Sequence, residues 1–195
     1  MKAIFMVHIP SIPKARQRLI EIVKRRSFQR GNEMKLASGR TSTFYFNMKP
    51  TMLDPEGSYL IGLLVLDLIK QDGAHLVGGL EMGAVPLATS VATVSYAQGN
   101  PIAAFFVRKK AKEHGTQTLL EGLAKGETID GKRIVVVEDV TTTGGSALKA
   151  VAAIGEAGGV VTKVVTIVDR QEGAASAFAE AGMRFSALLS LDDFQ

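Results

Sequence analysis

From residue 75 to residue 191 the chain alternates between short apolar runs and longer helical patterns, and this alternation limits the possible folds more than any other feature. We predict strands at 75–79, 102–107, 133–138, 161–168 and 185–191, and helices at 84–97, 145–157 and 173–181. Strands that alternate with helices of these lengths form a mostly parallel sheet covered on both faces. Residues 134–137 are all β-branched, as is typical of a buried central strand. The sequence therefore predicts the α/β class.

The segment before this alternation has a different pattern. We predict a helix at 13–26, strands at 34–36 and 44–46 joined by a turn at Ser38-Gly39, and a helix from Asp54-Pro55 to about residue 71. Asp54 suits the N-cap of that helix and Pro55 suits its first turn. The chain has no internal repeat and no low-complexity linker.

Composition removes several classes of protein. The 195 residues include no cysteine, which excludes disulfides and thiolate metal sites. The apolar run at 60–69 is interrupted by Gly62 and Asp67 and is too short to span a bilayer. The apolar start of the chain is short for a signal peptide. We therefore expect a cytoplasmic protein without a membrane partner.

The formal charge of +4 fits either nucleic acid or an anionic small molecule. Nucleic-acid binders usually cluster basic residues with stacking aromatics, whereas aromatics here are 6% of the chain and include no Trp. The basic run at 24–26 ends a predicted helix, where cations complement the helix dipole. We expect no nucleic-acid partner.

The most informative segment is IVVVEDVTTTGGS, residues 134–146. A buried strand ends in Glu138 and Asp139, and a Thr/Gly turn leads into a helix. Ligands of open parallel sheets bind at the carboxyl ends of strands, and a helix N-terminus offers free N–H groups to an anion. Carboxylates can accept hydrogen bonds from sugar hydroxyls. The segment therefore predicts a ribose 5-phosphate site, and the alternative is an ordinary strand-to-helix turn with solvated acids.

Competing motifs do not fit their context. GETIDGKR at 126–133 resembles a P-loop but ends in Arg and precedes a strand. No G-x-G-x-x-G occurs, which argues against a dinucleotide site. His8, His75 and His114 lack metal-ligand spacing.

IVVVEDVTTTGGS resembles the signature with which type I phosphoribosyltransferases bind phosphoribosyl pyrophosphate (PRPP). The resemblance implies PRPP contacts by Glu138, Asp139, Val140, Thr141, Thr142, Thr143, Gly144, Gly145 and Ser146. It also implies that family's fold, a central mostly parallel sheet flanked by helices with a small N-terminal hood that contains a hairpin. We expect a single domain over 1–195, with a core at about 51–182 and a hood that takes about 1–50 and the C-terminal strand.

KLASGRTSTFYFN, residues 35–47, resembles the hairpin of the orotate-specific branch of this family. The resemblance implies that Lys35 reaches the PRPP site and that Tyr45 and Phe46 border the orotate ring, with Thr142 also near orotate. A flat ring is favourably packed against aromatic faces. Simple strand core is the alternative explanation of Phe44-Tyr45-Phe46.

RKKAKEH, residues 108–114, lies in a polar stretch between two strong strands and resembles the branch's mobile catalytic loop. The resemblance implies PRPP contacts by Arg108, Lys109, Lys112 and His114, with Arg108, Lys112, His114 and Asp139 as catalytic residues. Basic side chains stabilise the charge of departing pyrophosphate. In the family this loop is shared across subunits, which implies a homodimer. A solvated basic loop is the alternative.

VDRQEG, residues 168–173, resembles the family segment with an orotate-contacting arginine, so Arg170 would pair with the substrate carboxylate. A surface arginine at a strand end is the alternative. One position departs from the pattern, because many relatives have a lysine where this chain has Gly83. Backbone amides at 81–83 could hold pyrophosphate instead.

The resemblance implies transfer of the phosphoribosyl group of PRPP to orotate, in de novo pyrimidine (UMP) biosynthesis. We expect Mg²⁺ as the cofactor, held mainly by pyrophosphate oxygens without a direct protein ligand. Two alternatives remain: a purine phosphoribosyltransferase with the same PRPP site, and a PRPP-sensing regulator that binds DNA.

Overall fold

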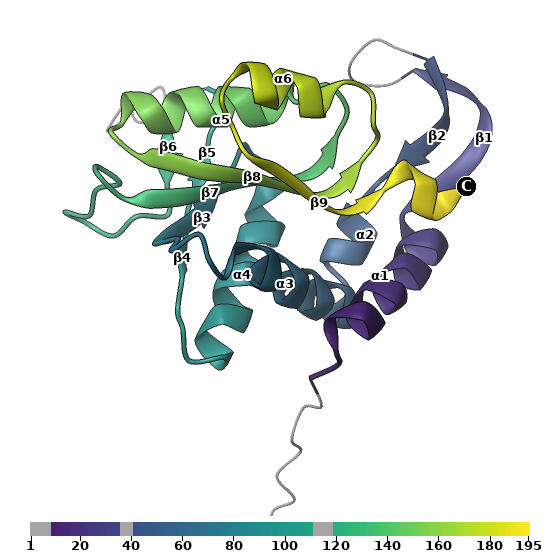
Figure 1. Cartoon of the computed structure of the whole chain (residues 1–195), viewed down its shortest axis with the longest axis horizontal. Coiled ribbons are helices and arrows are strands. Elements are labelled where there is room, and N and C mark those ends of the chain that lie inside the picture. Colours follow the sequence, from purple (N-terminus) through teal and green to yellow (C-terminus); the bar gives the residue numbers. More distant parts are fainter. Residues whose placement is uncertain (1–8, 36–40, 111–118) are drawn as a thin grey trace, which may run out of the picture.

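The architecture is built around one parallel sheet (Figure 1). The computed structural model describes residues 9–35, 41–110 and 119–195, without the side chains of 32–35, 41 and 42. Its helices are α1 (Ile12–Arg26), α2 (Lys49–Met52), α3 (Pro55–Ile69), α4 (Ala84–Ala97), α5 (Gly145–Glu156), α6 (Ala174–Glu180) and the 3₁₀ helix η1 (Leu191–Phe194). Its strands are β1 (Phe28–Lys35), β2 (Thr41–Phe46), β3 (Leu76–Gly78), β4 (Ala103–Ala104), β5 (Phe106–Val107), β6 (Leu120–Glu121), β7 (Arg133–Thr141), β8 (Val160–Asp169) and β9 (Phe185–Ser190).

The central sheet has the strand order β4-β3-β7-β8-β9, and each neighbouring pair is parallel. Strand β7 lies in the middle, as its run of β-branched residues predicts. Helix α4 returns the chain from β3 towards β4, α5 joins β7 to β8, and α6 joins β8 to β9. The predicted α/β class with a mostly parallel sheet is confirmed.

Alternating side chains of β7 face two separate cores. Val135 and Val137 pack into the core built with α1, α3 and α4, whereas Ile134 and Val136 pack into the core built with α5 and α6. All four side chains are at most 1% exposed. Figure 1 shows the two groups of helices on opposite faces of the sheet. A strand apolar at every position is therefore required by burial on both sides.

The helix boundaries follow from local chemistry. Asp54 caps α3 by accepting a hydrogen bond from the Gly57 N–H at 3.0 Å, and Pro55 is the first residue of the helix. Helix α4 spans the predicted residues 84–97. The four-residue α2 was not expected from the sequence. Among the described residues, no helix is both long and apolar enough to cross a membrane.

The C-terminal strand β9 pairs with β8 and forms an edge of the central sheet. One sequence expectation is corrected. The range 102–107 contains two short strands instead of one: β4 pairs with β3, whereas β5 pairs with β6 in a separate antiparallel ribbon. The chain leaves the main sheet at Phe105, whose side chain is buried with the α5 core.

The predicted hairpin is present but longer than expected, with β1 and β2 antiparallel and the turn at 36–40 outside the described residues. Its base is held by Phe28, Phe46 and Phe194, whose ring centroids are separated by 5.1 to 5.3 Å. The hairpin projects beyond the end of the sheet (Figure 1). It is thus positioned over the edge where the parallel strands end.

Candidate active site

Three neighbouring strands bring the candidate residues to one edge of the sheet. Strands β3, β7 and β8 are adjacent and parallel, so their carboxyl ends lie side by side. The turn at 79–83 follows β3, the acids and the Thr/Gly loop end β7, and Arg170 follows β8. This is the edge at which open parallel sheets bind ligands.

The acids at the end of β7 differ in their surroundings. Glu138 accepts a hydrogen bond from the Thr141 hydroxyl at 3.3 Å. Burial, followed by the nearby charge of Asp139, raises the pKa of Glu138 to about 7, although hydroxyl hydrogen bonds from Thr141 and Ser146 oppose this shift. Asp139 accepts a hydrogen bond from the Val140 N–H at 3.0 Å. Both carboxyl groups are fixed by the strand that bears them.

The loop after the acids has the geometry of an anion site. Thr141 is buried, Thr142 is half-buried, and Thr143 is exposed. Gly144 has a left-handed backbone with φ of 82°. A side chain there is unfavourable for two reasons, because this backbone conformation favours glycine and because a Cβ would lie 3.0 Å from the Phe178 ring. Helix α5 begins at the next residue, and the N–H groups of its first turn are available to an anion.

The turn after β3 packs directly on β7. A Cβ at Gly83 would lie 2.5 Å from Oδ1 of Asp139, so the lysine expected there is incompatible with the present position of that carboxylate. The Glu81–Met82 peptide bond is cis. Glu81 also donates its N–H to the Val107 carbonyl at 2.8 Å and accepts the Lys109 N–H on its side chain at 2.8 Å. The turn therefore joins the acidic strand end to the start of the basic segment.

Of the basic segment, Arg108 and Lys109 are described, whereas Lys112 and His114 lie outside the described residues. The Arg108 guanidinium donates to the Lys110 carbonyl at 3.1 Å and lies 3.6 Å from the Glu121 carboxylate. It is therefore directed towards its own ribbon in this structure. The Lys109 side chain is exposed.

Arg170 connects the sheet to the hairpin. Its side chain is 3% exposed, forms an ion pair with Glu172 at 2.8 Å, and donates from Nη1 to the Phe44 carbonyl at 3.1 Å. Its backbone N–H donates to the Thr141 carbonyl at 3.0 Å. Gln171, next in the chain, has a positive φ of 59°, an uncommon backbone conformation that is often found at functional sites. Arg170 therefore links the end of β7, the end of β8 and β2.

The hairpin residues divide by strand face. Tyr45 is 41% exposed, whereas Phe46 is 6% exposed and packs among Phe28 and Phe194. This burial supports the strand-core explanation for Phe46, and its contact with orotate stays a prediction. Lys35 pairs with Thr41 through the backbone, and its side chain is outside the description.

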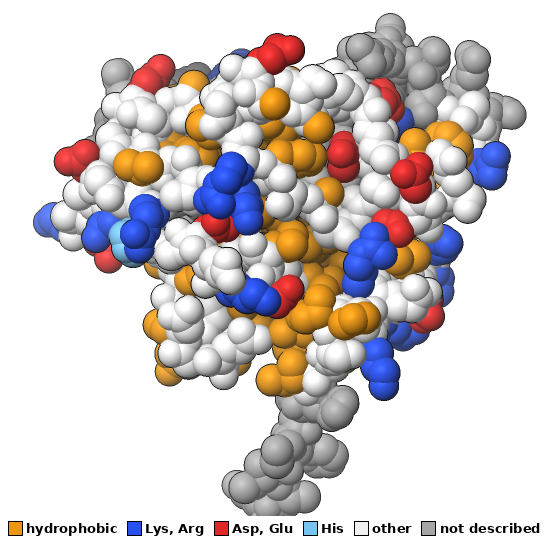
Figure 2. Space-filling view, viewed as in Figure 1, with side chains coloured by type: hydrophobic (Ala, Val, Ile, Leu, Met, Phe, Trp, Pro, Cys, Tyr) orange, Lys and Arg blue, Asp and Glu red, His pale blue; other side chains and the backbone are white. Residues whose placement is uncertain are grey.

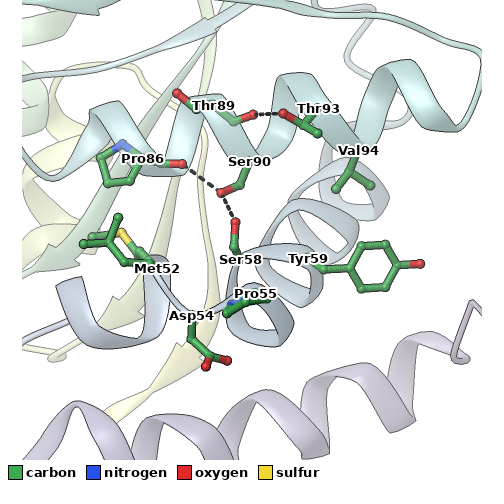
Figure 3. Close-up of a pocket in the computed structure, with 11 residues that line it drawn as sticks. Met52, Asp54, Pro55, Ser58, Tyr59, Pro86, Thr89, Ser90, Thr93 and Val94 are labelled. Atoms are coloured by element: carbon green, nitrogen blue, oxygen red, sulfur yellow. Dashed lines mark hydrogen bonds between the residues drawn. The ribbon is translucent and has the colours of Figure 1, made fainter. Parts of the chain in front are cut away.

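A separate hollow of about 460 Å³ lies between α3 and α4 (Figure 3). Its floor holds Ser58 and Ser90, whose hydroxyls are 2.7 Å apart, and Ser90 donates to the Pro86 carbonyl at 2.8 Å. The residues that line it do not include Glu138, Asp139 or the Thr/Gly loop. On the molecular face in Figure 2, basic and acidic side chains are interspersed, as expected from their dispersal in the sequence.

Sequence reasoning missed two functional candidates. Glu81 and Glu172 hold Lys109 and Arg170, respectively, yet neither was assigned a role. Glu172 lies two residues after the predicted arginine, which was a usable signal. Glu81 is 28 residues from Lys109 and accepts a backbone N–H, so no side-chain pattern marks it.

An acid-ended strand, a Thr/Gly loop at a helix N-terminus and a parallel sheet are together the features expected of a phosphoribosyltransferase. The model of the phosphoribosyl transferase domain family matches residues 64–178. An orotate phosphoribosyltransferase of Bradyrhizobium sp. strain ORS 278 is 61% identical over 92% of this chain and 97% of its own length. The Mycobacterium tuberculosis H37Rv orotate phosphoribosyltransferase in complex with Fe(III) dicitrate is 42% identical over 92% of this chain and 98% of its own, with a TM-score of 0.79. The same enzyme in complex with PRPP is 40% identical over the same shares of the two chains, with a TM-score of 0.75. The chain belongs to the orotate phosphoribosyltransferase family.

Proposed function

We propose that this protein transfers the phosphoribosyl group of PRPP to orotate, giving orotidine 5′-phosphate and pyrophosphate in de novo pyrimidine (UMP) biosynthesis. The observation that carries the proposal is the junction of the phosphate loop with Arg170, whose N–H binds the Thr141 carbonyl and whose guanidinium contacts the hairpin. A site for ribose phosphate is thereby joined to a cation suited to a planar carboxylate.

The ribose phosphate end is bound by β7 and its loop. Residues 141–146 donate hydroxyl and backbone hydrogen bonds to the 5′-phosphate, and the N-terminus of α5 adds a favourable dipole. Glu138 and Asp139 accept hydrogen bonds from the ribose hydroxyls. These contacts hold the anomeric carbon in place while its bond to pyrophosphate breaks, so catalysis rests mainly on positioning and electrostatics.

The base is placed by the hairpin and the end of β8. Arg170 pairs with the orotate carboxylate, and exposed Tyr45 offers a ring face beside it, with Thr142 close to both substrates. Because Arg170 is paired with Glu172 in this structure, orotate must share or replace that partner. An orotate ring nitrogen then attacks the anomeric carbon through an oxocarbenium-like transition state.

Pyrophosphate is held by the backbone amides of Met82 and Gly83 in the turn at 81–83, where the Glu81 N–H already donates to the Val107 carbonyl, and by basic residues that begin at Arg108 and Lys109. Lys35, Lys112 and His114 are assigned by resemblance, with Lys112 and His114 as the main catalytic contributors of their loop. We assign Asp139 a catalytic role, and its carboxylate lies beside the turn, because a Cβ at Gly83 would be 2.5 Å from its Oδ1.

A magnesium ion would arrive with PRPP and be held mainly by pyrophosphate oxygens, without a direct protein ligand, because this hard cation prefers the oxygen atoms of substrate phosphates. Glu138 and Asp139 remain assigned to the ribose hydroxyls. Bound Mg²⁺ would neutralise charge on the pyrophosphate oxygens. The protein contribution is to orient the ribose and the leaving group.

We further propose a homodimer in the cytoplasm, in which the loop that begins at Arg108 is shared across subunits, and no nucleic-acid partner. The family resemblance of RKKAKEH supports the shared loop. Sedimentation of the purified protein measures the oligomeric state directly.

The test of function is orotate consumption followed by ultraviolet absorbance with PRPP and Mg²⁺, with adenine, hypoxanthine and uracil assayed separately. We expect loss of orotate that depends on both PRPP and Mg²⁺. Turnover of a purine without turnover of orotate would retain the PRPP site and overturn the roles of Tyr45 and Arg170.

A further inference from the structure

Glu81 places a carboxylate in a turn that is proposed to bind an anion. The turn packs against the end of β7, because a Cβ at Gly83 would meet the Asp139 carboxylate. Two acids therefore lie close to the proposed position of pyrophosphate. A carboxylate at such a position repels an anionic ligand, so another role is needed to explain its presence there.

The task is visible in the contacts of Glu81. Its backbone N–H donates to the Val107 carbonyl at 2.8 Å, and its Oε1 accepts the Lys109 N–H at 2.8 Å. These two bonds lie on either side of Arg108, whose own N–H donates to the Leu119 carbonyl at 2.8 Å. The main chain at 107–109 is thus held to the turn on one side and to the β5–β6 ribbon on the other.

We infer that Glu81 is a positioning residue that fixes the main chain of Lys109 beside the pyrophosphate-binding turn. Without its carboxylate the Lys109 N–H loses its acceptor, and the contacts described for Val107 and Arg108 no longer extend to Lys109. The lysine ammonium then spends less time beside the leaving group. This inference rests on the proposed function, because it assumes that Lys109 contacts PRPP.

Charge and hydrogen bonding at Glu81 have opposite effects on PRPP, so two substitutions separate them. Glu81→Gln keeps an oxygen acceptor for the Lys109 N–H and removes the negative charge. Glu81→Ala removes both. A positioning role predicts that Glu81→Ala weakens PRPP binding about fivefold or more, whereas Glu81→Gln binds PRPP as well as the unaltered protein or more tightly.

The experiment measures the dissociation constant of PRPP by titration calorimetry with Mg²⁺ present, together with the KM values of PRPP and orotate. Glu156→Ala is the matched control, since it removes an exposed acid at the far end of α5. In a Lys109→Ala background, we expect Glu81→Ala to weaken PRPP binding by less than about twofold, because a residue that acts through Lys109 loses its effect when Lys109 is removed. The KM of orotate should stay unchanged in each Glu81 variant.

Equal tightening of PRPP binding in the Ala and Gln variants would show that Glu81 acts only through its charge, and would overturn the inference. A lowered thermal midpoint with an unaltered dissociation constant of PRPP would overturn it too, because that pattern marks a purely structural contact. Calorimetry does not depend on orotate turnover. A protein that binds PRPP but leaves orotate unchanged would therefore refute the proposed function while still testing Glu81.

Discussion

The two halves of the candidate site are built in different ways. The part proposed to bind the ribose phosphate of PRPP consists of one continuous segment, in which the end of β7, the Thr/Gly loop and the start of α5 follow each other within residues 138–146. The base side joins segments that are far apart in the chain, because Arg170 contacts the carbonyl of Phe44, 126 residues earlier. The first half is therefore fixed by local backbone geometry, and the second by a small number of long-range contacts.

This difference separates binding of the common substrate from selection of the base. The Thr/Gly loop after β7, which is proposed to bind ribose phosphate, can be retained while the hairpin and Arg170 change. The comparison predicts that damage on the base side leaves PRPP binding intact, whereas damage on the PRPP side lowers the use of every base. The substitutions below test this separation.

The largest effect is expected on the base side, from Arg170→Met. The variant loses the partner proposed for the orotate carboxylate, so we expect the KM of orotate to rise about 100-fold or more. We also expect the free energy of unfolding to fall by about 3 kcal/mol, because Glu172 loses its ion-pair partner. Kinetics and urea unfolding measure the two effects.

A double variant with Glu172→Gln provides the control for Arg170→Met. It should regain part of the lost stability, since the carboxylate that formed the ion pair with Arg170 is removed as well, but it should not regain orotate turnover. A weakening of PRPP binding comparable to that of orotate would contradict the proposed separation of the two halves.

The next effect concerns Glu138 on the PRPP side. Its pKa is raised from 4.5 to about 7, so between these pH values the folded protein retains a proton that the unfolded chain has released. The free energy of unfolding therefore falls as the pH rises through this range, by on the order of 3 kcal/mol, and Glu138→Gln should remove this part of the pH dependence. Urea unfolding at several pH values measures it, with Glu180→Gln, an exposed acid, as the control. Parallel pH profiles for the two variants would rule out the effect.

A smaller effect is expected from Gly144→Ala. The new side chain must adopt a left-handed backbone and lies 3.0 Å from the Phe178 ring, so we expect a loss of about 2 kcal/mol in the free energy of unfolding and weaker PRPP binding. Gly131→Ala is the matched control, because its φ is also positive at 66° but no atom lies within 4 Å of the added Cβ. Equal losses in both variants would exclude a contribution from the ring contact.

The smallest effect on stability is expected from Gly83→Ala. Its Cβ would lie 2.5 Å from Oδ1 of Asp139, so the carboxylate must leave the position in which it accepts the Val140 N–H. We expect the KM of PRPP to rise about tenfold while the thermal midpoint stays close to that of the unaltered protein. Gly155→Ala, with open space around its Cβ, is the control. An unchanged KM would mean that the position of Asp139 is unimportant for PRPP.

The sequence predicted the contiguous half better than the assembled half. The segment 134–146 contains its strand, acids and loop in order, so its arrangement follows from local rules. The burial of Phe46 depends on contacts with Phe28 and Phe194, and hairpin periodicity alone does not reveal which face meets them. The place of β9 in the central sheet likewise depends on a tertiary contact, which is its pairing with β8.

The same reasoning explains why supporting residues escaped notice. Glu81 contacts the backbone N–H of Lys109, a group that every residue except proline carries. The sequence therefore cannot indicate which residue is the partner of Glu81. The split of 102–107 into two strands depends on pairing with Leu120 and Glu121, which lie beyond a long polar segment. Local strand propensity does not reveal which distant residues pair with each other.

The bond between Arg170 and the hairpin ends on the main-chain carbonyl of residue 44, so it does not depend on which side chain that residue carries. Point mutations at residue 44 can change the packing of the hairpin over generations without deleting the acceptor that Arg170 uses. An insertion or deletion in β2 would instead shift the register and carry the acceptor away. This contact is therefore insensitive to which side chain residue 44 carries, but sensitive to the length of β2.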